Sequence, residues 1–135
     1  MFIDVDDFIH PRKCEFMKKV FNENPEVDAV VHNYLDPGQQ WEDINNFELY
    51  EVTQADPDPD PIPPGWFDIP RTNVTCPVEG QRLHHGHMTC RTKIFQDLCY
   101  DESMSLGEDG TFCRSILEHA DYKLFYTPQK LIIYN

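Results

Sequence analysis

Lysine and arginine are scarce in this sequence. Its 135 residues include 11 of them against 24 aspartates and glutamates, which gives a formal net charge of −13. A chain with this charge repels the phosphate backbone of nucleic acids and the anionic surface of membranes, so we expect neither as a general partner. A phosphorylated ligand is still compatible with the charge, because a divalent cation can screen acidic side chains locally.

Long apolar runs and closely paired cysteines are also missing. No stretch approaches the roughly 20 apolar residues of a membrane-spanning helix. Asp4, Asp6 and Asp7 interrupt the apolar segment that an N-terminal signal peptide would need. The five cysteines are odd in number and contain no C-x-x-C pair. This usage favours reduced thiols in a cytoplasmic protein over a disulfide framework.

The first seven residues combine a short apolar run with three acidic residues. This pattern predicts a buried strand that delivers carboxylates to the rim of a sheet. Because side chains alternate along a strand, we expect Asp4 and Asp6 on one face and Asp7 on the other. Two carboxylates on one face favour a hard cation such as Mg²⁺ between them. A strand followed by a solvated acidic turn explains the same pattern.

A helix and a second strand are expected next. Pro11 suits the first turn of a helix, and the apolar spacing predicts that this helix covers residues 12–24. A run rich in β-branched residues at 27–34 predicts the next strand. The order strand, helix, strand predicts a parallel pair joined by a right-handed crossover. Asp4 and Asp6 would then lie at the carboxyl end of a strand, where open α/β sheets bind ligands.

The middle of the chain is less regular. Residues 47–52 alternate in polarity and predict an edge strand. Residues 55–65 alternate aspartate with proline, which predicts an extended acidic excursion and favours a solvated loop over a calcium site. Trp66 follows this excursion, and it either packs on the core or presents its ring to a sugar.

Three of the six histidines are clustered at His84, His85 and His87. With Cys76 and Cys90 they suggest a zinc site, but their spacing matches no familiar ligand pattern. Neighbouring residues of a strand also point to opposite faces. We therefore expect one or two of these histidines to line a pocket.

The last third predicts two helices and two short strands. The helices are expected at 92–98 and 111–119, and the strands at 122–126 and 130–134 on either side of Thr127-Pro128. Glu108 and Asp109 directly precede the second helix. An acid there is favoured at the N-cap or in the first turn, which gives Asp109 a structural explanation as well as a chemical one.

Taken in order, these motifs resemble the family 2 glycosyltransferases of the GT-A fold. The resemblance covers nearly the whole chain apart from residues 36–81. It rests on the order and spacing of six segments: Asp4-Val5-Asp6-Asp7, 24–31, 86–95, 100–103, Gly107-Glu108-Asp109 and 122–128.

The resemblance implies an inverting, metal-dependent transfer from a nucleotide-sugar donor to a hydroxyl of a carbohydrate or glycoconjugate acceptor. Asp4-Val5-Asp6 looks like the family's D-x-D motif. Asp6 would bind Mn²⁺ or Mg²⁺, Asp4 would assist through the ribose or a metal-bound water, and Asp7 would add a further acid near the donor. Asp109 would be the general base of the E-D motif. The neighbouring Glu108 would raise the pKa of Asp109 if it faced the same pocket. Acceptor contacts are expected from the region of Trp66, His85, His87 and Arg91.

The implied fold class is α/β: an incomplete GT-A, Rossmann-like sheet flanked by helices. A complete domain of this family has several βα units before the D-x-D strand, whereas this chain begins at that strand. One partial domain is therefore expected, with the D-x-D strand, helix and next strand at 1–35, a variable acidic segment at 36–81 and an acceptor side at 82–135. The unpaired edge of the first strand would favour association.

Two other readings remain open. The missing βα units also fit a non-catalytic remnant of the same fold that acts as a carbohydrate- or protein-binding module. The acidic N-terminus alone fits an unrelated metal-binding protein.

Overall fold

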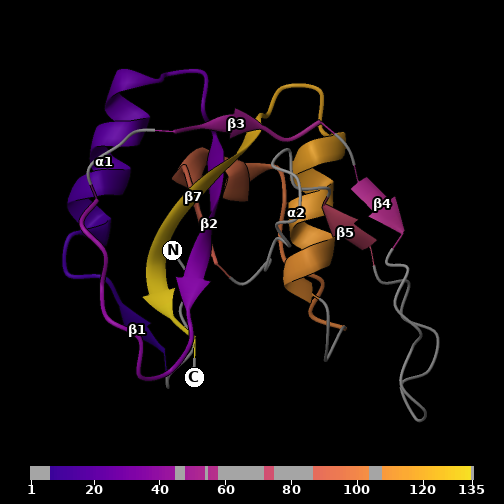
Figure 1. The fold of residues 1–135 in the computed structure, drawn as a ribbon. Helices are drawn as coiled ribbons and strands as arrows, with labels where there is room; N and C mark the ends of the chain where they lie inside the picture. The colour runs from indigo at the N-terminus through magenta and orange to yellow at the C-terminus, as the bar shows by residue number, and fades with distance from the viewer. Residues whose placement is uncertain are drawn as a thin grey trace, which may run out of the picture.

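The computed structural model describes residues 7–44, 48–53, 55–57, 72–74, 87–103 and 108–134. This part of the chain is a mixed α/β fold with a curled mixed sheet and two α-helices (Figure 1). The helices are α1 (Lys13–Glu23), the 3₁₀ helix η1 (Thr92–Gln96) and α2 (Glu108–Glu118). The strands are β1 (Phe8–Ile9), β2 (Ala29–Leu35), β3 (Tyr50–Glu51), β4 (Ala55–Pro57), β5 (Thr72–Val74), β6 (Met88–Cys90) and β7 (Leu124–Ile133).

β2 and β7 form the parallel centre of the main sheet. β6 pairs with β2 in the antiparallel direction. The other side of β7 carries two short antiparallel strands, β3 opposite Phe125 and Tyr126 and β1 opposite Ile132 and Ile133. β2 confirms the strand expected at 27–34, and the parallel pair confirms the α/β class at this coarse level.

The prediction of two strands separated at Thr127-Pro128 is wrong, because β7 is one continuous strand of 10 residues. The register against β2 jumps from His32 opposite Thr127 to Asn33 opposite Lys130. Pro128 therefore has no partner on β2, and on the other side it falls between the stretches that pair with β3 and β1. Proline lacks an amide donor and is tolerated in a sheet at such irregularities.

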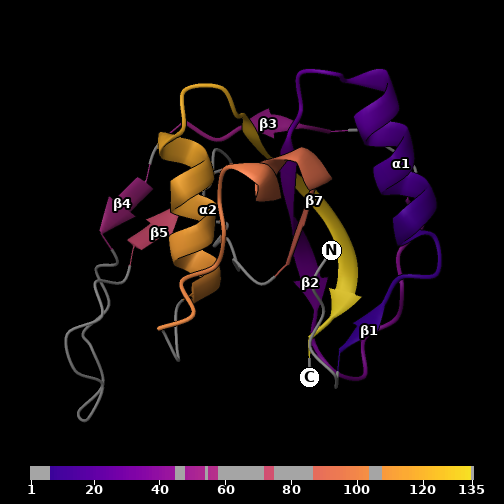
Figure 2. The same ribbon diagram turned by 180° about the vertical axis from the view of Figure 1, so that it is seen from behind.

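The two α-helices cover opposite faces of the β2–β7 pair (Figures 1 and 2). Alternation along β2 explains this arrangement, since Val30 faces the α1 side while Ala29 and Val31 face the α2 side. The α1 cluster consists of Phe16, Met17, Val20, Val27, Val30 and Leu131. The helix predicted at 12–24 is confirmed by α1.

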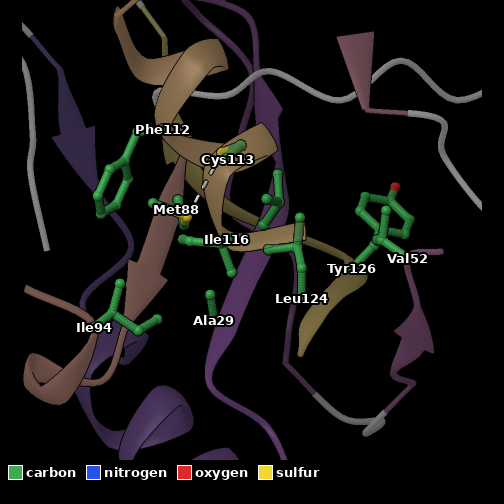
Figure 3. Close-up of a cluster of buried hydrophobic side chains, with 10 residues drawn as sticks. Ala29, Val52, Met88, Ile94, Phe112, Cys113, Ile116, Leu124 and Tyr126 are labelled. Carbon is green, nitrogen blue, oxygen red and sulfur yellow. Dashed lines mark hydrogen bonds between the residues drawn. The ribbon is translucent and has the colours of Figure 1, made fainter. Parts of the chain in front are cut away.

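A second apolar cluster lies between α2 and the sheet (Figure 3). Phe112, Cys113 and Ile116 come from α2, and the sulfur of Cys113 contacts that of Met88 at 3.6 Å. Ala29, Val31, Val52, Ile94, Leu124 and Tyr126 complete the cluster. The two C-terminal helices differ slightly from expectation. α2 begins at Glu108 rather than Thr111, and the helix at 92–98 is a 3₁₀ helix ending at Gln96.

The remaining elements are short. Of the edge strand expected at 47–52, Tyr50 and Glu51 form β3, whereas Phe47 lies outside the described residues. The start of the acidic excursion forms β4, which pairs with β5 in a separate two-stranded sheet. Residues 1–6 of the strand predicted at 1–7 lie outside the described residues. The described strand at this end, β1, runs antiparallel to β7, and β2 forms its parallel pair with β7 rather than with an N-terminal strand. None of the described helices has the length and apolar character needed to cross a bilayer.

Candidate functional site

The site lies at the carboxyl ends of β2 and β7, at the lower end of the molecule in Figure 1. Because these strands are parallel, their carboxyl ends meet at one edge of the sheet. α1 and α2 also begin at this end (Figures 1 and 2). The residue before β6 lies here too, since Met88 is opposite Val31 in the antiparallel pairing. Ligands bind at this edge in open α/β sheets.

Lys13, the first residue of α1, is fully buried at this end. It precedes Phe16, Met17 and Val20 at helical spacing, so it continues the buried face of the helix. Its Nζ has no hydrogen-bond partner within the part of the chain that the structure describes. Burial lowers the pKa of Lys13 to about 8, although the negative charges of Cys14 and Asp7 oppose the shift.

His32 is a buried side chain of β2, in phase with Val30 and so on the α1 side of the sheet. Its Nδ1 lies 2.9 Å from the carbonyl oxygen of Asn33. A carbonyl can only accept, so Nδ1 carries the proton and Nε2 presents a lone pair. Nε2 has no hydrogen-bond partner among the described residues. Burial, and then the charges of Lys13 and His87, lower the pKa of His32 well below its usual value and keep it neutral.

An aromatic cluster lies beside His32. The ring of His87 is stacked on that of His32, with the ring centroids 5.8 Å apart. His87 is buried, and its ring also contacts Tyr34 at 5.3 Å and Tyr134 at 5.4 Å. Tyr134 is 44% exposed, so this cluster runs from His32 to the surface. The sequence predicted that His87 lines a pocket on the acceptor side. The structure places it beside His32 of β2, and its contact with an acceptor stays a prediction.

Acidic residues approach the same end from two elements. Asp7 is half-buried directly before β1, near enough to Lys13 to favour its charged form. Glu108 and Asp109 are the first two residues of α2, whose N-terminus lies at this end of the sheet (Figures 1 and 2). Negative charge at this position is favoured by the helix dipole. The structure thus brings the start of the E-D helix to the same edge as Asp7.

Several predicted site residues lie outside the described ranges: Asp4, Asp6, Trp66 and His85. Their roles stay predictions. Within the ranges that the structure covers, no group of three histidine, cysteine, aspartate or glutamate side chains is arranged to hold a metal ion. The four described cysteines, Cys14, Cys90, Cys99 and Cys113, carry free thiols.

Arg91 lies away from this group, at the amino end of β2. Its Nε donates to the carbonyl of Val27 at 2.7 Å, and its Nη2 donates to the carbonyls of Phe21 at 2.6 Å and Asn24 at 3.3 Å. The guanidinium also lies over the ring of Phe21, 5.0 Å from its centroid. These bonds hold the end of α1 and the connection to β2 in place. Contact of Arg91 with an acceptor stays a prediction.

The sequence reasoning missed Lys13 and His32, although a signal for both was present. Lys13 interrupts the apolar face of an amphipathic helix, and His32 interrupts the apolar side of a buried strand. A polar residue at a core position is more informative than a charged residue on the surface. Comparison with known protein families, with curated proteins and with solved structures found no match to this chain.

Proposed function

We propose that this chain is part of a GT-A glycosyltransferase domain that transfers a sugar from a nucleotide-sugar to an acceptor hydroxyl, with inversion. One observation carries the proposal. Asp7, which directly follows Asp4-Val5-Asp6, precedes the strand that pairs with the carboxyl end of β7. The helix that begins with Glu108 and Asp109 starts at the same end of the sheet (Figure 1). Asp7, which follows the first acidic motif, and the start of the helix that carries the second therefore lie at the same end of the sheet.

The chemistry needs acidic groups in two roles. Transfer releases a nucleoside diphosphate, and Mn²⁺ or Mg²⁺ held by Asp6 and Asp4 would neutralise the charge on this leaving group. The acceptor hydroxyl is a weak nucleophile, and Asp109 would take its proton as the sugar carbon is attacked. Inversion requires the base and the diphosphate on opposite faces of the sugar, which two separate motifs can provide.

Donor binding is the first test. Isothermal calorimetry with Mn²⁺ and a panel of uridine- and guanosine-diphosphate sugars should show binding that disappears when the metal is chelated. Asp6→Asn should abolish this binding, whereas Asp121→Asn, which removes the same charge from the exposed connection before β7, should not. If no donor binds in the presence of Mn²⁺, the proposal of a donor site on this chain is wrong.

The catalytic base is tested separately. Asp109→Asn should leave Mn²⁺-dependent donor binding intact but abolish release of the nucleoside diphosphate. Asp121→Asn, an exposed change of equal charge, should leave release unchanged. Donor binding without release in the unmodified chain would instead identify a non-catalytic binding module of the same fold.

A further inference from the structure

Lys13 and His32 form a buried polar pair that the acidic motifs do not explain. Both side chains are almost completely buried, at 0% and 1% exposed, and they come from different elements. Neither Lys13 Nζ nor His32 Nε2 has a hydrogen-bond partner among the residues that the structure describes. Buried polar atoms are normally satisfied, so each such exception calls for an explanation. A bound group that satisfies both atoms is the simplest one.

Both residues lie at the same end of the interface between α1 and the sheet, Lys13 on the face of Phe16 and Met17 and His32 in phase with Val30. Their atoms that lack a partner among the described residues are chemically complementary. The charge of Lys13 is one of the causes that keep His32 neutral. Lys13 Nζ can only donate hydrogen bonds, while His32 Nε2 can only accept one because Nδ1 holds the proton. A group bound between them must therefore accept from the ammonium and donate to the imidazole.

The local charge specifies the group further. A buried ammonium favours an anion as its partner. Asp7 acts on Lys13 from nearby, so a ligand with a single negative charge is repelled less than a dianion. A protonated phosphoryl group with a single negative charge meets all three conditions, because it carries a negative oxygen, an accepting oxygen and a P–OH donor. Sulfate meets only part of them, since it is unprotonated near neutral pH.

We propose that Lys13 and His32 form a binding site for a protonated phosphoryl group with a single negative charge. A phosphoryl oxygen accepts from Lys13 Nζ, and the P–OH donates to His32 Nε2. The group is either inorganic phosphate, as H₂PO₄⁻, or the singly protonated terminal phosphate of a nucleotide. The aromatic cluster borders the site, since His87 is stacked on His32 and contacts Tyr134, which is partly exposed.

This site is independent of the proposed glycosyl transfer. Its two residues belong to neither acidic motif, and it requires no divalent cation. Phosphate binding without metal would therefore support it even if no nucleotide-sugar binds. Conversely, metal-dependent donor binding through Asp6 would survive its failure.

The test is a titration followed by the ¹⁵N resonance of His32 Nε2, at about pH 6, near the second pKa of phosphate monoesters. Divalent cations are removed by chelation. Inorganic phosphate should shift this resonance in a saturable manner, and sulfate at equal ionic strength should bind at least about tenfold more weakly, the loss expected for a charge-assisted hydrogen bond. Equal binding of the two ions, or no saturable shift with phosphate, overturns the proposal.

Two variants identify the residues responsible. Lys13→Met should weaken phosphate binding at least about tenfold, whereas Lys18→Met, an exposed lysine of the same helix, should not change it. In His32→Leu, phosphate and sulfate should bind equally, as seen in the amide resonances of Tyr34 and Asn33. Discrimination that persists in folded His32→Leu contradicts the role of Nε2.

The source of the phosphoryl group is decided by competition. If the site takes a nucleotide, uridine diphosphate should displace inorganic phosphate and bind more tightly. If the site takes free phosphate, uridine diphosphate should bind more weakly than phosphate. Both results support the site and assign its ligand. Binding of uridine diphosphate that is insensitive to Lys13→Met shows that the nucleotide uses another part of the chain.

Discussion

Arg91 donates from Nη2 to the carbonyl oxygen of Phe21 at 2.6 Å, across 70 residues of sequence. Phe21 lies in the last turn of α1, where helix carbonyls have no partner within the helix. The same guanidinium bonds Val27, in the connection from α1 to β2. Arg91 therefore fixes the C-terminal end of α1 against the start of the central strand, and so fixes the helix that carries Lys13.

We expect Arg91→Met to lower the free energy of unfolding by about 2–4 kcal/mol, because charge-assisted bonds are lost and buried carbonyls are left without donors. Arg91→Lys should recover only part of this, since an ammonium cannot reproduce the guanidinium fork. Arg114→Met is the control, as its ion pair with Glu118 is exposed and should cost less than about 1 kcal/mol. Urea unfolding measures all three. A loss in Arg91→Met no larger than that in Arg114→Met would contradict this role.

Lys13 should make stability depend on pH in the alkaline range. Its pKa is about 8 in the folded chain, against 10.5 for an ordinary lysine. Below about pH 8 the side chain is charged in both states, and the fold carries the full cost of burying that charge. As pH rises from about 8 to 10.5, the unfolded chain keeps a proton that the folded chain has lost, so stability rises. The gain should reach about 3 kcal/mol, to within a factor of about two.

Lys13→Met removes this dependence. The variant should be more stable than the parent by up to about 3 kcal/mol at pH 7, and the difference should vanish above about pH 10.5. Other groups titrate in the same range, so the difference between the two proteins at each pH is the relevant quantity. Urea unfolding without phosphate, from neutral to alkaline pH, provides it. A variant that is less stable at pH 7 would show that the ammonium is already compensated.

The sequence predicts those elements that depend on neighbouring residues better than those that depend on pairing between distant residues. The apolar spacing of α1 and the β-branched run of β2 are local, and both elements occur where expected. Thr127-Pro128 carries an equally local signal for a break, but pairing with β2, β3 and β1 on either side keeps β7 continuous. Tertiary pairing therefore overrides the local preference for a break at Pro128, because no described residue of a neighbouring strand is paired with Pro128.

In the candidate site, too, local features could be predicted from the sequence and long-range contacts could not. The sequence alone placed Asp109 at a helix start, because that inference depends on neighbouring residues. It could not show that Arg91, four residues after His87, lies at the opposite end of β2, since that follows from the antiparallel direction of β6. That Lys13 and His32 are buried at the same end of the interface likewise depends on how α1 lies across the sheet. No local pattern contains that information.

Tyr122 should titrate at unusually high pH. Its hydroxyl donates to the carboxylate of Asp97, and this bond is the main cause that raises its pKa to about 12. Burial and the negative charges of Asp97, Asp28 and Asp121 act in the same direction. Asp97→Asn should bring the pKa of Tyr122 back towards the ordinary value of 10.0. The phenolate absorbance of the parent minus that of Tyr122→Phe isolates this residue. An unchanged midpoint in Asp97→Asn would rule out the hydrogen bond as the cause.

Ile116 tests whether the apolar cluster of Figure 3 holds α2 in place. Its side chain is fully buried and faces the sheet side of the helix. We expect Ile116→Ala to lower the free energy of unfolding by about 2–5 kcal/mol and Ile116→Val by about 0.5–1.5 kcal/mol, because a larger cavity loses more contacts. Glu118→Ala, on the exposed side of the same helix, should cost less than about 1 kcal/mol.

Ile116→Ala also tests whether the position of α2 affects the rate of the proposed reaction. α2 begins with Glu108 and Asp109, and the cluster around Ile116 is what fixes this helix against the sheet. If Asp109 acts as a positioned base, Ile116→Ala should slow release of the nucleoside diphosphate at temperatures where the variant is still folded, while donor binding changes little. Ile116→Val should lie between the parent and Ile116→Ala. Equal rates in all three folded proteins would show that the position of α2 does not limit the reaction, and would argue against Asp109 as its base.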